Sequence, residues 1–412
     1  MASCASMSAA ISMPAAKPAR SIHLITGFPV VRTTLTLLLA FATAASLAEP
    51  RARDLAVPFD GEPGPLNAIT DVAGVTVGHV TLIDDLANGR KVRTGVTAIL
   101  PRGRDTITTP VFAGSAVLNG AGEMTGRSWI KESGILDGPV MLTNTHSVGA
   151  VHQATIAWRV RHGSADAMGY WWSTPVVAET WDGYLNDVNG FHIKAAHVDA
   201  ALDGAAAGPI AEGNVGGGTG MTCHEFKCGI GTASRRVEIE GRAQMVGVLV
   251  QANYGTRPSL RIAGVPVGRH LQENRLKSDS LSDGDSGSII IVVATDAPLL
   301  PHQLNRIARR AGMGLARMGS YAGDGSGDIF VAFSTANAKA VGDAAVASAK
   351  FLENGRLDAL FEATVQATEE AIVNSMIAAR DMEGDGGRSA KALPHAALIE
   401  LLQTYGRSGT PR

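Results

Sequence analysis

The hydrophobic pattern of the chain predicts a succession of strands followed by a group of helices. Small and β-branched apolar residues alternate with polar ones over 69–82, which predicts a pair of strands. Shorter apolar runs predict further strands at 94–100, from 140, at 244–251, from 288 and at 330–333. Because strands occur in both halves and helices are grouped late, the pattern favours an α/β layered fold over strict βαβ alternation.

Helices are predicted where apolar residues recur three and four positions apart. One follows the strand from 140, over 150–159, and two long ones are predicted over 336–352 and 357–380, with a short one near 396–402. Pro301 opens another, because proline is favoured in the first helical turn. Its apolar face carries Leu304, Ile307, Ala308, Ala311, Leu315 and Met318.

The loops are rich in glycine and polar residues. Segments 51–66 and 257–285 are predicted to be exposed connections, and the small residues of 113–126 predict no element. Segment 213–220 reads Gly-Asn-Val-Gly-Gly-Gly-Thr-Gly, which resembles a phosphate-binding loop but lacks its Lys-Ser/Thr ending. Close packing of backbone is therefore favoured over nucleotide binding at this segment.

Composition is typical of a globular protein with a large core. The chain has 412 residues, 45% hydrophobic and 18% charged, which allows one large domain or two. The formal net charge is −2 and there is no long basic block, so nothing indicates a nucleic-acid partner.

Residues 1–48 are predicted to be a signal peptide. Arg32 is followed by an apolar stretch over 33–42, and Ser46 and Ala48 occupy the usual −3 and −1 positions of a cleavage site. The apolar stretch is shorter than the roughly 20 residues that span a bilayer. We therefore expect a mature chain that begins at Glu49 and is periplasmic or secreted, with a retained membrane anchor as the alternative.

Two of the three cysteines, Cys223 and Cys228, lie five positions apart with His224 between them. An exported protein can form a disulfide, but the spacing does not establish one. Two cysteines and one histidine without a second cluster are weak evidence for a metal site. Structural thiols are the favoured interpretation, and no metal or cofactor is expected.

The junction at 287–288 is a candidate site of chemistry. Gly287 lacks a Cβ, so the peptide bond before Ser288 can adopt conformations closed to other residues. If this bond were cut, Ser288 would carry both a nucleophilic hydroxyl and a free α-amine of pKa about 7.7–8.0 as a nearby base. On the pattern alone, an ordinary turn before a strand is the commoner explanation. Ser286 is a rival nucleophile, but Asp285 precedes it and it lies outside the strand, so Ser288 is favoured.

Several motifs of this chain, in the same order, resemble those of the DmpA-type aminopeptidases, the D-aminopeptidase/esterase and β-peptidyl aminopeptidase family. The most specific are Gly287-Ser288 before the apolar strand and the later run from Gly325 through Asp328. The resemblance extends from about 66 to 381. The matching segments are 175–187, 217–221, 250–255, 287–299 and 325–337.

The resemblance implies a proenzyme that cuts itself between Gly287 and Ser288. The products, 49–287 and 288–412, would remain together in one layered αββα sandwich similar to that of N-terminal nucleophile hydrolases. The implied activity is release of N-terminal residues from short peptides, amides or esters through an acyl-enzyme on serine, without a cofactor. The family also implies a homo-oligomer of cleaved pairs, with no membrane contact after processing.

The resemblance also implies roles for individual residues. Ser326 and Asp328 would polarise and orient the amine or hydroxyl of the nucleophile. Asn253 would donate a hydrogen bond to the developing oxyanion, and Glu179 would hold the positive amine of the substrate. Without the resemblance, the first two residues indicate an ordinary turn, Asn253 a turn residue and Glu179 a surface carboxylate.

Three further side chains are candidates for the substrate site. The resemblance implies a tyrosine near Glu179 that assists the oxyanion, and Tyr184 is the nearest one. Trp181 lies closer along the chain but offers only an N–H donor. His146 is a candidate general base, although a satisfied member of the polar cluster that follows the strand from 140 is the favoured interpretation.

Two other functions compete with a hydrolase. One is acyl transfer similar to that of ornithine acetyltransferase, in which the nucleophile is a threonine, whereas this chain offers Ser288. The other is a non-catalytic periplasmic binding protein that keeps the fold and never matures. The presence of Ser288, Ser326, Asp328 and Asn253 together argues against loss of catalysis.

Overall fold

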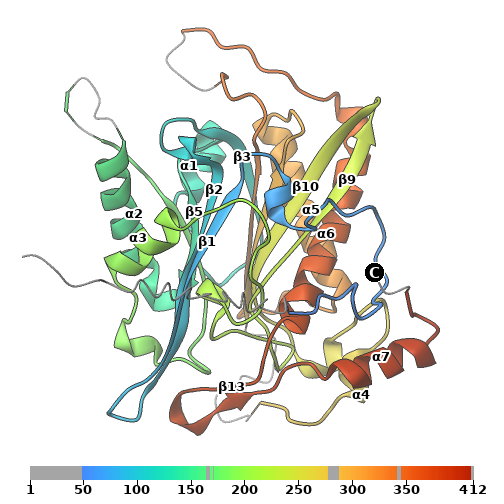
Figure 1. Ribbon diagram of the computed structural model, residues 1–412. Helices are drawn as coiled ribbons and strands as arrows, with labels where there is room; N and C mark the ends of the chain where they lie inside the picture. The colour runs from blue at the N-terminus through green and yellow to red at the C-terminus, as the bar shows by residue number, and fades with distance from the viewer. Residues whose placement is uncertain (1–48, 164–167, 170, 277–286, 341–344, 410–412) are drawn as a thin grey trace, which may run out of the picture. The chain divides into compact units, whose positions relative to one another are not determined.

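The computed structural model describes most of the chain after the predicted signal peptide (Figure 1). The predicted signal peptide and the rival nucleophile Ser286 lie outside the described residues. The described ranges are 49–163, 168–169, 171–276, 287–340 and 345–409.

Two sheets make up the centre of the described chain. The six-stranded sheet has the order β4-β3-β12-β11-β10-β9, and the four-stranded sheet has the order β1-β2-β5-β6. The first comprises β4 (Ile135–Leu136), β3 (Val111–Gly120), β12 (Gly327–Ser334), β11 (Ser288–Thr295), β10 (Arg242–Asn253) and β9 (Ile230–Ile239). The second comprises β1 (Thr76–Asp85), β2 (Lys91–Arg104), β5 (Val140–Asn144) and β6 (Val176–Thr180).

Helices cover the outer face of each sheet, as Figure 1 shows. Helices α2 (Val148–His162) and α3 (Ala195–Asp203) pack on the four-stranded sheet, whereas α5 (Pro301–Arg317) and α6 (Asp358–Ile377) pack on the six-stranded one. This arrangement is the predicted αββα sandwich. The smaller elements are α1 (Arg127–Ser133), α4 (Val267–His270), α7 (His395–Thr404) and the hairpins β7 (Thr222–Cys223) with β8 (Phe226–Lys227) and β13 (Met382–Glu383) with β14 (Ser389–Ala390).

Strand β11 is apolar without interruption because both of its faces are buried. Ile289 and Ile291 belong to the core under α5 and α6, whereas Ile290 and Val292 belong to the core between the two sheets. Since side chains alternate along a strand, the side chain of Ser288 is directed to the same face as Ile290. The candidate nucleophile therefore begins a fully buried strand and faces the space between the sheets.

Most predicted strands and helices are present, with three corrections to the strands. Segment 69–82 contains a short 3₁₀ turn and then a single strand, because Gly74, with φ +92°, separates the two. Its partner is β2, which extends well beyond the predicted 94–100. Segment 113–126, for which no element was predicted, contributes most of β3, a strand of the larger sheet.

The predicted exposed connections are partly core. Ala52 in the first and Leu260 in the second are fully buried. Arg257 is also buried, because its guanidinium donates to four backbone carbonyl oxygens and lies 3.4 Å from the ring centroid of Phe226. The polar composition of this segment therefore led to a wrong prediction of exposure for Arg257, which is buried and binds the backbone of the loop around it.

The predicted helix over 336–352 is wrong for the residues that the structure describes there. Asn337 and Lys350 exchange two hydrogen bonds of 2.9 Å between the Asn337 amide and the Lys350 backbone. Leu352 donates its N–H to the carbonyl of Pro298. The alanine-rich composition favours helix, but these tertiary bonds hold the described residues of this segment outside a helix.

Candidate functional site

Ser288 lies between two strands that bring the other candidates to it. It pairs with Asn253 of β10 on one side and with Gly327 of β12 on the other. Its side chain is buried, with 5% of its surface exposed. The Gly327 N–H donates to Ser288 Oγ at 3.1 Å and to the Gly287 carbonyl oxygen at 3.2 Å. The hydroxyl and the carbonyl of the candidate scissile bond therefore share one donor.

Gly287 is required at this junction for lack of space. A Cβ on Gly287 would lie 2.1 Å from the Asn253 carbonyl oxygen and 2.5 Å from Tyr254 Cα. Its φ does not fall in the left-handed region. The expectation that glycine supplies an unusual conformation is therefore replaced by a steric reason, which is the close approach of β10 to the peptide bond before Ser288.

Ser326 and Asp328 form a buried pair on either side of the Gly327 donor. Ser326 Oγ donates to Asp328 Oδ1 at 2.8 Å, and neither side chain is exposed. Asn119 donates to the Ser326 carbonyl and so anchors the loop before β12. The backbone of Gly327, which lies between the two residues of the pair, connects them to Ser288.

Asn253 presents its amide on the same face as Ser288. Directly opposed residues of an antiparallel pair direct their side chains to one face, and Asn253 is 6% exposed. Its Oδ1 accepts a hydrogen bond of 2.9 Å from the Thr222 N–H. Because the oxygen end is held there, the amino end, Nδ2, is the donor that the amide can present elsewhere.

Glu179 lies at the end of β6 and is 4% exposed. Its carboxylate accepts from the Glu123 N–H at 2.9 Å and from Thr145 Oγ1. Burial raises the pKa of Glu179, and these two bonds partly oppose the rise. A Cβ on Gly122 would lie 3.2 Å from Glu179 Oε1 and 3.1 Å from Gly327 Cα, so one segment of backbone separates the carboxylate from the donor of Ser288.

The model of peptidase family S58 matches residues 67–390. The chain belongs to this family. It is 53% identical over 397 residues to the β-peptidyl aminopeptidase BapA of Sphingosinicella microcystinivorans, covering 92% of this chain and 98% of that one. The BapA of Sphingosinicella xenopeptidilytica is 47% identical over 89% of this chain and 94% of its own.

Solved structures of related peptidases have the same fold. The L-aminopeptidase D-Ala-esterase/amidase from Ochrobactrum anthropi, described as a variant of the Ntn hydrolase fold, superposes with a TM-score of 0.82 at 47% identity, covering 88% of this chain and all of that one. A Burkholderia sp. β-aminopeptidase gives 0.79 at 48%, covering 87% and 99%. These findings confirm the family resemblance and the αββα layers, and they identify the chain as a serine aminopeptidase.

Tyr184 lies in a separate cluster of this S58 aminopeptidase. Its neighbours in that cluster include Leu185 and Met382, and the Arg388 guanidinium lies 5.6 Å from its ring centroid. The structure thus places Tyr184 beside the segment that follows α6. Its predicted role in substrate binding remains a prediction.

Two other candidates lie at the surface. Trp181 is 37% exposed. His146 is exposed, and its ring stacks on Phe191 with centroids 5.9 Å apart. The favoured interpretation of His146 as a satisfied member of a polar cluster stays a prediction. Its neighbour Thr145 is the one that contacts Glu179, a contact that sequence reasoning missed.

Cys223 and Cys228 form a disulfide with Cα atoms 5.6 Å apart. This replaces the favoured interpretation of structural thiols. Over the described ranges, no group of three metal-ligating side chains is present. Within the same ranges, no helix is long and apolar enough to cross a membrane.

The glycine-rich segment 213–220 is packed against backbone, as predicted. Gly216–Gly218 forms a buried 3₁₀ turn. A Cβ on Gly217 would lie 2.0 Å from Gln251 Oε1, and one on Gly218 would lie 2.4 Å from the Ile230 nitrogen. The absence of side chains at these glycines thus allows the turn itself to pack closely against β9 and β10.

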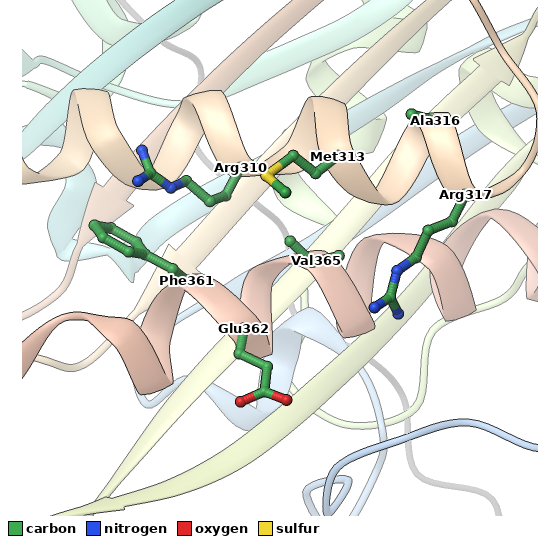
Figure 2. A pocket seen from close by; sticks show the side chains of 7 residues that line it. All are labelled: Arg310, Met313, Ala316, Arg317, Phe361, Glu362 and Val365. Carbon is green, nitrogen blue, oxygen red and sulfur yellow. The ribbon is translucent and has the colours of Figure 1, made fainter.

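A groove lies between α5 and α6 (Figure 2). The guanidinium of Arg310 lies 3.9 Å from the Phe361 ring centroid there. None of the candidate catalytic residues lines this groove, which lies on the outer helical layer. The chemistry predicted for Ser288 is therefore placed elsewhere. The groove is lined by Arg310, Met313, Ala316, Arg317, Phe361, Glu362 and Val365.

Proposed function

We propose that this S58 aminopeptidase is an exported proenzyme that cuts its own Gly287–Ser288 bond and then uses Ser288 to remove N-terminal residues from short peptides, amides or esters. The observation that carries the proposal is the single Gly327 N–H that contacts both Ser288 Oγ and the Gly287 carbonyl oxygen. Such a donor lies where negative charge develops when the hydroxyl attacks that carbonyl.

The first reaction is an acyl shift within the chain. Ser288 Oγ attacks the carbonyl carbon of Gly287, the C–N bond breaks, and the hydroxyl proton passes to the departing Ser288 nitrogen. Water then hydrolyses the ester, which leaves a carboxylate on Gly287 and a free hydroxyl and amine on Ser288. We assign the buried Ser326–Asp328 pair to orienting the hydroxyl before the cut and the amine after it.

The second reaction repeats this chemistry on a substrate. The positive N-terminus of the substrate pairs with Glu179, whose burial makes an unpaired charge costly. The Ser288 amine accepts the hydroxyl proton and later returns it to the leaving amine. Asn253 Nδ2 donates to the oxyanion of the tetrahedral intermediate, and water hydrolyses the acyl-enzyme.

We further propose that the substrates include peptides with an N-terminal β-amino residue. The support is the naming of two relatives, at 53% and 47% identity, as β-peptidyl aminopeptidases. Hydrolysis of β-alanine and L-alanine p-nitroanilides by the cut enzyme tests this. A rate only on the L-alanine compound would contradict it.

Export and assembly complete the proposal. The Cys223–Cys228 disulfide supports an oxidising compartment, since such bonds are rare in the cytosol. Removal of residues 1–48 would leave Glu49 at the N-terminus of the larger fragment. The cleaved pairs are proposed to form a homo-oligomer, which sedimentation of the mature enzyme would test.

Intact mass under denaturing conditions is the decisive experiment. The proposal expects two fragments, one of which begins at Ser288, together with aminopeptidase activity. Ser288→Ala should remain uncut and inactive. The matched control is Ser286→Ala, which should still yield the fragment that begins at Ser288. A cut, active Ser288→Ala variant, or an uncut Ser286→Ala variant, would move the nucleophile away from Ser288.

A further inference from the structure

A buried lysine is connected through hydrogen bonds to Asn253, the candidate oxyanion donor. Lys227, on β8, has no exposed surface. Its Nζ donates to the carbonyl oxygens of Met221 at 2.8 Å, Cys228 and Gly218, the last at 3.5 Å. Among the described residues, no carboxylate forms an ion pair with Lys227. A buried amine with only carbonyl partners is costly to keep, so its position calls for an explanation.

The lysine and Asn253 are joined by one peptide unit. The carbonyl of Met221 accepts from Lys227 Nζ, and the N–H of the same peptide, on Thr222, donates to Asn253 Oδ1 at 2.9 Å. The Cys228 N–H also donates to the Met221 carbonyl at 3.3 Å. Hydrogen bonds in such a chain polarise one another. Donation by the lysine thus strengthens the Thr222 N–H as a donor and fixes the plane of the peptide.

We propose that Lys227 is a positioning residue, which acts through the Met221–Thr222 peptide to hold the Asn253 amide with Nδ2 directed at the oxyanion. The inference rests on the proposed role of Asn253. Burial lowers the pKa of Lys227 well below its usual value, and in either protonation state the amine keeps an N–H that can donate to the Met221 carbonyl. The disulfide closes the hairpin that carries both Thr222 and Lys227.

The effect is expected on kcat and not on KM. Removing one oxyanion donor costs about 10²–10³-fold in kcat, so Asn253→Ala should lose that much. Lys227→Met keeps the length of the side chain and removes its donors, and kcat should fall by about tenfold or more within that limit. KM should stay within about twofold of the wild-type value, because Glu179 is untouched.

A double-mutant cycle separates positioning from a general structural role. If Lys227 acts through Asn253, adding Lys227→Met to Asn253→Ala should change kcat by no more than about twofold. Multiplication of the two losses would overturn the proposal, as would a single Lys227→Met variant with unchanged kcat. Both rates are expressed per cut Ser288 terminus, counted by mass.

Two controls distinguish failure of the Lys227 proposal from failure of the proposed function and from failure to fold. Appearance of the Ser288 fragment in each variant shows that self-cleavage stands whatever happens to Lys227, whereas an uncut, inactive wild-type protein would refute the proposed function itself. If Lys227→Met does not accumulate as folded, cut protein, Lys227→Leu, which also removes the N–H donors, carries the same cycle. Failure of both variants to fold would make the lysine a folding requirement and overturn a role confined to positioning.

Discussion

Gly287→Ala should separate self-cleavage from turnover. The added methyl group would lie 2.1 Å from the Asn253 carbonyl oxygen and 2.5 Å from Tyr254 Cα. Both are backbone atoms of the β10 end, so no side-chain rotation relieves the clash. The peptide before Ser288 must therefore move by roughly 1 Å away from β10, at a cost of about 1–3 kcal/mol in stability.

The displacement moves the carbonyl that Ser288 is proposed to attack. A misplacement of about 1 Å can reduce a reaction rate by about 10²-fold, and the shared Gly327 donor at 3.2 Å would be weakened as well. We therefore expect self-cleavage to slow by about 10²-fold. Once the bond is cut, residue 287 is no longer linked to Ser288, so kcat per cut Ser288 terminus should stay near the wild-type value.

The assay follows the uncut chain and its two fragments by mass over time after refolding or synthesis, with peptidase rates normalised to cut protein. Gly149→Ala is the matched control, because a Cβ there meets nothing within 4 Å and Gly149 lies in α2. Cleavage of Gly287→Ala at the wild-type rate would refute the steric argument. A large loss of kcat per cut terminus would show that Gly287 acts in turnover too.

Three further predictions concern Glu179, the Ser326–Asp328 pair and Asp182. Glu179→Gln should raise KM for amine substrates by at least about tenfold, and an unchanged KM would show that Glu179 does not bind the substrate amine. In the wild-type enzyme, the acid limb of the kcat/KM profile should lie above the ordinary glutamate range, because burial raises the pKa of Glu179. Ser326→Ala and Asp328→Asn should each slow self-cleavage and turnover by about 10²-fold, with the double variant no worse, as stopped-flow and mass time courses would show. Burial raises the pKa of Asp182 from 3.8 to about 6, so the folded state binds this proton more tightly than the unfolded state does. Protonation of Asp182 therefore adds about 3 kcal/mol to the free energy of unfolding below about pH 4, and this contribution is lost as pH rises through about 6. The free energy of unfolding, measured by denaturant titration, should fall between about pH 4 and pH 6 in the wild type and not in Asp182→Asn. Parallel pH profiles of the two proteins would contradict this prediction.

The sequence was informative where chemistry and strand pattern coincide. The apolar run after Ser288 indicated a buried strand, and the structure explains the run by the two cores on either side of β11. The αββα arrangement itself came from the family resemblance, since the strand pattern predicted only layers. The roles of Ser326, Asp328, Asn253 and Glu179 stay predictions. The structure places the first three beside Ser288 and places Glu179 on the other side of the Gly122 backbone from Gly327.

Other parts of the site could not be read from the sequence. The donors on Ser288 and Asn253 are backbone N–H groups of Gly327 and Thr222, and every residue except proline has such a group. Lys227 stands in a polar stretch between two cysteines, where exposure is the usual expectation. Its burial depends on carbonyl groups that only the folded hairpin brings together.

The order of strands in the larger sheet has a consequence for the lifetime of the enzyme. Strands β11 and β12, from the proposed smaller fragment, are inserted between β3 and β10 of the larger one. After the proposed cut, each copy would be a non-covalent heterodimer that shares a single sheet, and its separation would require the β3–β12 and β10–β11 ladders to open together. Refolding of the cut molecule would then require the two fragments to associate, and the equilibrium of that association depends on their concentration. A mature molecule that opens fully has lost the covalent link that guided its first folding, so its persistence is governed by the rate of opening.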